Sequence, residues 1–293
     1  GSTEIGKDKT LDELMNDYDI VVLATGLGGD RKINIPGEQL RGVFGAGRVT
    51  RLINSHPFET LDELEVGSHL AIIGHGNVAI DLLRLSLLEP EQLAQHGVDK
   101  DLADVIAPNT LSQIHVIGRS AIQDAKFDPA MIRELSRIPN VRFTSDAENF
   151  SVDNAEAKKR IEVINSLVAS STVNATRTVN FYFGWQPLEI CGSTKVEKVR
   201  FKSNTDEILE LRADAIYSAI GFEQAKDAAI QIETLISKDS DLEHGFIFER
   251  LYCVGWLRRG PQGTIPVNRT DAKKISERII QDFREKNLVK VRE

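Results

Sequence analysis

The sequence is poor in cysteine and has no long apolar run, and each of these absences excludes a class of protein. Its two cysteines, Cys191 and Cys253, lie far apart and form no C-x-x-C pair, which disfavours a disulfide scaffold, a structural zinc site and a redox-active disulfide. No apolar stretch is long enough to span a bilayer, and no secretory signal is visible. We therefore expect a cytoplasmic protein with no membrane partner. The net charge of −8 argues against a nucleic-acid partner.

Two further kinds of chemistry lack the residues they require. The six histidines show no ligand spacing, so no metal site is expected. No serine lies on a G-x-S-x-G turn, which disfavours a serine nucleophile. The chain has 293 residues, of which 41% are hydrophobic, so it can still bury a large core. The sequence thus predicts a folded protein without an identifiable catalytic side chain.

The most informative segment is His-Leu-Ala-Ile-Ile-Gly-His-Gly-Asn-Val-Ala at residues 69–79. An apolar strand enters a glycine turn, and a helix follows directly. Gly74 permits the sharp turn, Gly76 lets a phosphate approach the backbone, and the first helical N–H groups attract an anion. A purely structural glycine turn is the alternative interpretation. The residues expected to hold a pyrophosphate are Gly74, His75, Gly76, Asn77 and Val78.

The residue after the next strand indicates which dinucleotide binds. An acidic residue there would accept hydrogen bonds from the ribose of NAD, whereas a cation suits the 2′-phosphate of NADP. The strand expected at 114–117 is followed by Gly118 and Arg119, and a guanidinium can bind a phosphate through two hydrogen bonds. The sequence therefore favours NADP(H). An ordinary solvent-exposed arginine is the alternative.

Strands and helices alternate along most of the chain, which predicts an α/β fold with a mainly parallel, doubly wound sheet. Buried strands are expected at 18–26, 69–73, 114–117, 141–144, 214–219 and 251–255. The segments 178–183, 188–190 and 195–202 are predicted to form an antiparallel meander. Helices are expected at 11–15, 49–54, 77–88, 91–96, 100–106, 131–137, 154–169 and 271–283.

Four blocks of sequence carry a family resemblance. They are residues 18–26 with 30–31 and 35–38, residues 74–81, residues 118–119 with 127 and 133–135, and residues 254–265 with 268, 271 and 272. Together they resemble the adrenodoxin-reductase type of ferredoxin–NADP⁺ reductase, a two-domain FAD flavoprotein family. The resemblance runs from about Leu11 to Ile280. The fourth block is the most specific, because Trp256 stands where related disulfide reductases usually have an acidic residue.

The resemblance implies a role for these positions. Residues 75–78 match the turn that binds the NADP pyrophosphate, and Arg119 matches the first of two arginines that hold the 2′-phosphate. Trp256 would lie against the flavin and the nicotinamide, although an ordinary buried aromatic is the alternative. The helix expected from Asp271 would direct its positive end toward the flavin. Backbone groups at the edge of the isoalloxazine ring would come from Gly263, Thr264 and Ile265.

The sequence also departs from the family pattern. Ser120 replaces the second arginine, and Met131 stands where the family has a glutamate that helps to hold the adenosine ribose. Losing one charge-assisted phosphate contact would weaken the preference for the 2′-phosphate by about 1.5–3 kcal/mol. Ser120 can still donate one hydrogen bond, and Lys126 is a candidate for the missing charge. NADP is favoured over NAD, but the preference stays open.

A larger departure is the missing FAD-binding segment, which in the family precedes the segment matched by residues 18–26. We expect residues 1–35 and 221–293 to be remnants of an incomplete FAD-binding domain. Residues 36–220 would form a three-layer, Rossmann-like NAD(P)-binding domain with the antiparallel meander inserted. FAD would belong to the complete protein and would not be bound tightly by this chain. Whether the truncation is natural stays open.

The activity implied by the resemblance is electron transfer from NADPH through FAD to a ferredoxin-type iron–sulfur partner, with this portion inactive alone. An electron-input subunit of a glutamate synthase-like enzyme is disfavoured because N-terminal cysteine clusters are absent. A disulfide reductase is disfavoured because paired cysteines are absent. A non-catalytic nucleotide sensor stays open, as does enzymatic activity of this chain. A basic patch that could receive an acidic ferredoxin would comprise Arg48, Arg51, Arg258 and Arg259. Ordinary solvent-exposed arginines are the alternative, and they explain the pattern equally well.

Overall fold

The computed structural model describes residues 3–61, 64–147, 154–263 and 265–286. The chain divides into two compact units. The larger unit is continuous in sequence and comprises residues 31–220. The smaller unit combines residues 1–30 with residues 221–293. Each unit therefore has its own core, and the smaller one is assembled from the two ends of the chain.

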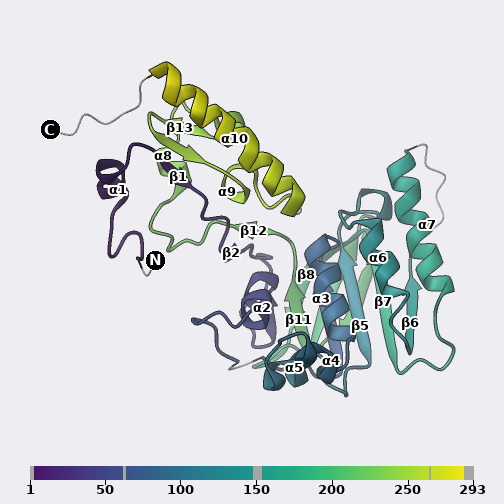
Figure 1. The fold of residues 1–293 in the computed structure, drawn as a ribbon. Helices are drawn as coiled ribbons and strands as arrows, with labels where there is room; N and C mark the ends of the chain where they lie inside the picture. The colour runs from purple at the N-terminus through teal and green to yellow at the C-terminus, as the bar shows by residue number, and fades with distance from the viewer. Residues whose placement is uncertain (1–2, 62–63, 148–153, 264, 287–293) are drawn as a thin grey trace. The chain divides into compact units, whose positions relative to one another are not determined.

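The larger unit contains a six-stranded sheet in which all neighbouring strands are parallel (Figure 1). This confirms the parallel sheet predicted from the sequence. Ile73 pairs with Ile117, so the segments that follow these two strands leave the sheet at the same edge. In spatial order the strands are β3 (Val43–Gly45), β11 (Ala215–Ser218), β4 (His69–Ile73), β5 (Gln113–Gly118), β7 (Arg177–Phe183) and β6 (Val141–Ser145).

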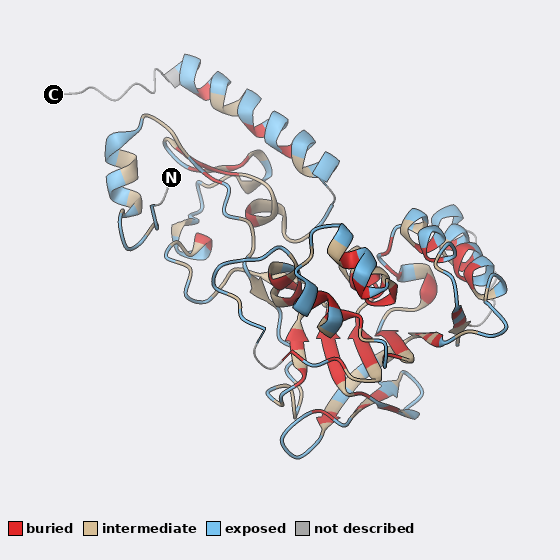
Figure 2. Cartoon of the chain, turned by 60° about the horizontal axis from the view of Figure 1, so that its bottom comes forward, coloured by how far each residue is buried: buried red, intermediate tan, exposed pale blue. Residues whose placement is uncertain are grey.

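Helices cover one face of this sheet. Leu70, Ile72, Ile114 and Val116 point into the core beneath them and are fully buried, and the strands that carry them are red in Figure 2. Near-continuous apolar runs of this kind are typical of strands covered on both faces. The helices are α2 (Ala46–Ile53), α3 (Asn77–Leu87), α4 (Pro90–Gln95), α5 (Lys100–Ile106), the short 3₁₀ helix η1 (Ile122–Asp124), α6 (Pro129–Leu135) and α7 (Ala155–Ala169).

A small antiparallel sheet covers part of the opposite face. Its strands are β8 (Trp185–Cys191), β9 (Lys198–Ser203) and β10 (Ile208–Arg212), with β9 in the middle. Val199 and Phe201 of β9 pack in one core with Ala71 and Ile73 of β4. The described helices of this unit contribute to the other core. The parallel sheet is therefore not doubly wound, because helices and strands occupy its two faces separately.

The placement of residues 178–183 in the antiparallel meander is wrong. These residues lie within β7, which runs parallel to both β5 and β6. Val179 and Phe181 point to the helical core and are buried. The alternate residues of β7 lie on the opposite face and are partly exposed, namely Thr178, Asn180 and Tyr182.

The smaller unit is built around strands from both ends of the chain. β1 (Val21–Leu23) pairs in parallel with β14 (Leu251–Cys253), and β13 (Phe246–Phe248) is antiparallel to β14. The strand expected at 18–26 is thus shorter than predicted. β2 (Gly29–Asp30) pairs with β12 (Phe222–Glu223) where the chain enters and leaves the larger unit. The helices are α1 (Leu11–Asp17), α8 (Ile232–Leu235), η2 (Leu242–His244), α9 (Trp256–Arg259) and α10 (Ile265–Lys286).

The start of α10 differs from the prediction. The helix begins at Ile265 and not at Asp271, with Pro266 in its first turn, where proline is well tolerated. Asp271 therefore lies inside the helix, and its carboxylate is used in a different way, described below. Within the described ranges, no helix is both long and apolar enough to cross a bilayer.

Two buried tyrosines allow the packing of each unit to be tested. The hydroxyl of Tyr217 on β11 is buried without a hydrogen-bond partner in the described structure, whereas the Tyr252 hydroxyl on β14 donates to Asp282 Oδ2 at 2.8 Å. We expect Tyr217→Phe to raise the free energy of unfolding of its unit by about 1 kcal/mol, because it removes an unpaired polar group. Tyr252→Phe should lower that of the other unit by about 1–3 kcal/mol.

Urea denaturation checks both values. Trp185 and Trp256 provide one fluorescence probe in each unit. A large destabilisation by Tyr217→Phe would contradict the described packing of the hydroxyl.

Candidate functional site

The glycine turn after β4 is held by the two neighbouring strands. The Gly74 N–H donates to the Ile117 carbonyl at 2.7 Å, and Gly74 has a φ of +130°. A Cβ at this position would lie 2.4 Å from the Ala219 carbonyl oxygen. Only glycine fits this turn without displacing the backbone.

Gly76 forms the open side of the same turn. It is the N-cap of α3, no side chain caps that helix end, and no acidic residue lies in the first turn. A Cβ on Gly76 would meet no described atom within 4 Å. The first N–H groups of a helix lack acceptors within the helix, so this end of α3 offers an accessible site for an anion.

The side chain of His75 turns into the protein. It is 6% exposed, its Nε2 lies 3.3 Å from the Val116 carbonyl oxygen, and its ring packs against Phe183 with centroids 4.3 Å apart. Burial lowers the pKa of His75 to about 4, although the contact with the Val116 carbonyl favours the charged form. The imidazole is therefore neutral near pH 7, and only the main chain of His75 faces the turn.

The loop that follows β5 is hydrogen-bonded to the glycine turn and to the first residue of α3. The N–H of Lys126 donates to the His75 carbonyl at 3.0 Å, and Lys126 forms an isolated parallel bridge with Gly76. The N–H of Asp128 donates to Asn77 Oδ1 at 2.7 Å. Sequence reasoning missed these ties, since they join residues far apart in the chain. The Asp128-Pro129 pair, a common helix start, was the available signal.

The predicted 2′-phosphate residues follow β5 at the same sheet edge. Arg119 is exposed and makes no hydrogen bond or ion pair within the described part of the chain. The Ser120 carbonyl accepts from the Gly184 N–H at 3.1 Å, and Ser120 is partly exposed. Met131 on α6 packs against the helical core, as does Val78 on α3. An arginine without a partner among the described residues and a partly exposed serine therefore lie where the 2′-phosphate is predicted to bind.

The smaller unit contains an open hollow of about 430 Å³. It lies where the parallel strands β1 and β14 end, beside α9 and α10. Gly26 and Gly255 have φ values of +66° and +67° there, and they let the backbone turn away from the strand ends. The lining residues are Ala24, Gly26, Val254, Gly255, Trp256, Asn268 and Ala272.

Trp256 gives this hollow its aromatic surface. Its ring stacks on Phe222 with centroids 5.4 Å apart, and its Nε1 is buried with no hydrogen-bond partner in the described structure. Gly263 has a φ of +86°, and the side chain of Ile265 is 84% exposed. Thr264 lies outside the described residues. Of the three predicted flavin contacts that the structure describes, only Trp256 lines the hollow.

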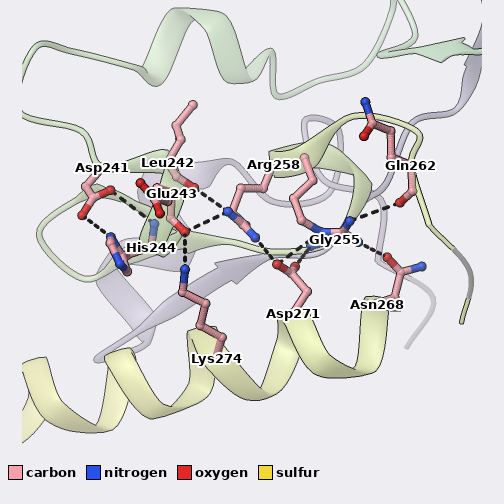
Figure 3. Close-up of polar contacts among 11 residues, drawn as sticks. Asp241, Leu242, Glu243, His244, Gly255, Arg258, Gln262, Asn268, Asp271 and Lys274 are labelled. Atoms are coloured by element: carbon pink, nitrogen blue, oxygen red, sulfur yellow. Dashed lines mark hydrogen bonds and ion pairs between the residues drawn. The ribbon is translucent and has the colours of Figure 1, made fainter. Parts of the chain in front are cut away.

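An ion-pair network fixes the wall of the hollow (Figure 3). Asp271 Oδ2 accepts from the Gly255 N–H at 2.7 Å, and the Asp271 side chain, 4% exposed, pairs with Arg258 and with Arg259 Nε at 3.2 Å. Burial raises the pKa of Asp271, but the Arg258 hydrogen bond and the Gly255 N–H outweigh it and lower the pKa overall. Asp271 thus joins α10 to the turn that carries Trp256.

The basic patch considered from the sequence is composed of paired residues. Arg258 also donates to the carbonyls of Leu242 and Glu243, each at 2.9 Å. In the larger unit, the Nε atoms of Arg48 and Arg51 lie 3.4 Å and 2.7 Å from carboxylate oxygens of Glu59. All four arginines serve internal contacts. In the part of the chain that the structure describes, no group of three or more His, Cys, Asp or Glu side chains could hold a metal ion.

Comparison with known proteins supports the family resemblance. No protein-family model matches the chain. Cindoxin reductase of Citrobacter braakii is 36% identical over 96% of this chain and 62% of its own length. The "Probable NADPH:adrenodoxin oxidoreductase, mitochondrial" of Schizosaccharomyces pombe is 28% identical, over 98% of this chain and 68% of its own. The solved structure of Mycobacterium tuberculosis FprA in complex with NADPH has a TM-score of 0.87 at 26% identity, covering 99% of this chain and 70% of that one.

These relatives confirm the resemblance predicted from the sequence, including its extent over nearly the whole of the chain. The chain itself spans 62% of the length of the cindoxin reductase. The match to the FprA structure covers both units, so it also supports the α/β fold with its parallel sheet.

The Asp271 network gives a prediction for stability. Asp271→Asn keeps an acceptor for the Gly255 N–H but leaves the buried Arg258 guanidinium without its counter-charge. We expect the smaller unit to lose about 3–5 kcal/mol of unfolding free energy at pH 7. The folded-state pKa of Asp271 is lowered, so its contribution is full above the ordinary Asp pKa of about 4 and is lost as pH falls through the folded value. The difference between wild type and variant should shrink below about pH 4.

Urea unfolding followed by Trp256 fluorescence measures this difference, in a Trp185→Phe background. Asp239→Asn is the matched control, because Asp239 is exposed in the same unit and should change the stability by less than about 0.5 kcal/mol. Equal stability of Asp271→Asn and wild type at pH 7 would show that the network does not support the unit.

Proposed function

From its relationship to the adrenodoxin-reductase-type ferredoxin–NADP⁺ reductases, we propose that this chain is the NADP(H)-binding portion of such a flavoprotein. The complete protein would pass electrons from NADPH through FAD to a ferredoxin-type iron–sulfur carrier. The observation that carries the proposal is the glycine turn at 74–76, with its uncapped helix end and its open space at Gly76. We propose further that residues 36–220 bind the dinucleotide and that this portion is inactive alone.

The residues present fit the diphosphate of a dinucleotide. Gly74 sets the turn, Gly76 keeps its outer side open, and the N–H groups at the start of α3 supply donors. No acidic residue in the first turn of α3 opposes an anion. The side chain of Asn77 is already engaged by Asp128, so the main chain is the part of this turn that would hold the phosphates.

The preference for NADP over NAD rests on Arg119. Its exposed guanidinium has no partner among the described residues and can therefore bind a 2′-phosphate without breaking an ion pair. Ser120 could add one hydrogen bond. The half-buried Met131 offers no polar atom to the ribose, so the adenosine end of the cofactor would be held less firmly than in the family pattern.

The smaller unit comprises residues 1–30 and 221–293 and so contains the predicted FAD-domain remnants at 1–35 and 221–293 except for residues 31–35, and we propose that it contributes to the flavin side. FAD, when bound, accepts a hydride and releases single electrons. The hollow offers Trp256 and glycine backbones to a flat ring, and the buried Trp256 Nε1 has no hydrogen-bond partner among the described residues. The described residues that line the hollow carry no positive charge for the FAD diphosphate. We therefore propose that this chain alone does not bind FAD tightly.

Calorimetry of the chain with NADP⁺, NAD⁺ and FAD in parallel tests the proposal. We expect measurable binding of NADP⁺, weaker binding of NAD⁺ and negligible binding of FAD. Arg119→Met should lower the affinity for NADP⁺ by about tenfold, the effect of one charge-assisted hydrogen bond, and leave NAD⁺ unchanged. Equal or tighter binding of NAD⁺ by the wild type would remove the argument from Arg119. For the complete protein, a flavin absorption spectrum separates a reductase from a non-catalytic nucleotide sensor.

Substitutions of the two glycines separate folding from binding. Gly76→Ala is expected to change the stability by less than about 0.5 kcal/mol, because its φ of −94° suits alanine and the added methyl meets open space. The methyl would occupy the approach to the helix end, so we expect at least about a tenfold loss of NADP⁺ affinity. Gly74→Ala should instead destabilise the larger unit, since its methyl would overlap the Ala219 carbonyl. Unaltered binding by Gly76→Ala would place the dinucleotide elsewhere.

A further inference from the structure

The loop that crosses the glycine turn carries one cation at a fixed position. The main chain of Lys126 is fixed by hydrogen bonding. Its N–H donates to the His75 carbonyl at 3.0 Å, and Lys126 forms an isolated parallel β-bridge with Gly76. The neighbouring Ala125 and Phe127 are both 2% exposed. Lys126 itself is exposed. The main chain is therefore anchored on both sides of Lys126 while its side chain points out of the protein at the turn.

The ammonium group of Lys126 is available to a ligand. It makes no hydrogen bond or ion pair with the residues that the structure describes. The nearest acids in sequence are Asp124 and Asp128, both exposed, and Asp128 Oδ1 is engaged with the Ala130 N–H at 2.8 Å, at the start of α6. Lys126 is thus a cation without a partner among the described residues, and its main chain is fixed beside Gly76, on the open side of the glycine turn.

The other groups at the glycine turn that could contact the diphosphate carry no full positive charge. The neutral His75 ring is turned inward, and the start of α3 supplies only neutral N–H groups and its helix dipole. Arg119 is assigned to the 2′-phosphate, further along the dinucleotide. A charge-assisted hydrogen bond is about twice as strong as a neutral one, so a single ammonium here would contribute substantially to binding.

We propose that Lys126 binds the diphosphate bridge of the dinucleotide, and not the 2′-phosphate for which the sequence made it a candidate. The assignment rests on the proposed function. Its specific support is the pairing of Lys126 with Gly76, the residue whose open side faces the expected diphosphate. Lys126 then strengthens the binding of NADP⁺ and NAD⁺ alike, whereas Arg119 discriminates between them.

The test compares both dinucleotides in calorimetry at low and high salt. We expect Lys126→Met to lower the affinities for NADP⁺ and NAD⁺ by about the same factor, roughly tenfold for one charge-assisted contact. The loss should be smaller at high salt, because the ammonium is exposed and screened. Lys126→Arg should retain binding. Lys100→Met is the matched control, since Lys100 is exposed at the start of α5, on the connection leading to the opposite edge of the sheet.

Each outcome distinguishes this assignment from the proposed function. If the folded wild type binds neither dinucleotide, the proposed function fails and the assignment fails with it. If the wild type binds and Lys126→Met loses affinity for NADP⁺ alone, Lys126 serves the 2′-phosphate and the assignment is overturned. Unchanged affinity for both dinucleotides overturns it as well, while leaving the proposed function intact. Circular dichroism of each variant establishes that any loss arises in a folded protein.

Discussion

The glycine turn of the larger unit depends on the parallel pairing of β4 with both of its neighbours. This pairing restricts the backbone conformation of the residue that follows β4. β4 lies between β11 and β5, and the residue that follows it is bound on one side by the Ile117 carbonyl and closed on the other by the Ala219 carbonyl. The chain must turn there in a conformation that favours glycine. Because the turn is rigid, the start of α3 presents its N–H groups in a fixed direction. Arrangement in advance of binding reduces the entropy lost when a ligand is held.

The local sequence pattern was sufficient to predict those elements whose structure depends mainly on their own residues. The apolar runs of β4 and β5 and the glycine spacing after β4 predicted the parallel strands and the turn. β7 was misassigned because Thr178, Asn180 and Tyr182 alternate with buried residues, a pattern typical of antiparallel strands with one open face. In this protein the alternation arises because the helices cover one side of β7 fully, while the other side stays partly exposed. A parallel strand at an incompletely covered part of a sheet has the same pattern.

Contacts between distant residues were beyond the reach of such patterns. The last helix was predicted to begin at Asp271, yet Asp271 lies inside α10 and its carboxylate accepts a hydrogen bond from the Gly255 N–H. The inward rotation of His75 depends on Val116 and Phe183, which belong to other strands. The arginines at 258 and 259 suggested a binding surface. The structure shows that both guanidinium groups form ion pairs with Asp271 inside the unit.

The pairing of β2 with β12 closes the chain around the larger unit at its point of entry and exit. Before residues 31–220 have folded, joining β1 to β14 would require closing a very long flexible loop, with a correspondingly large loss of chain entropy. Once that segment is compact, its two ends are already together and the remaining closure is short. The protein's topology thus favours an order of assembly in which the continuous segment folds first and the split unit condenses afterwards.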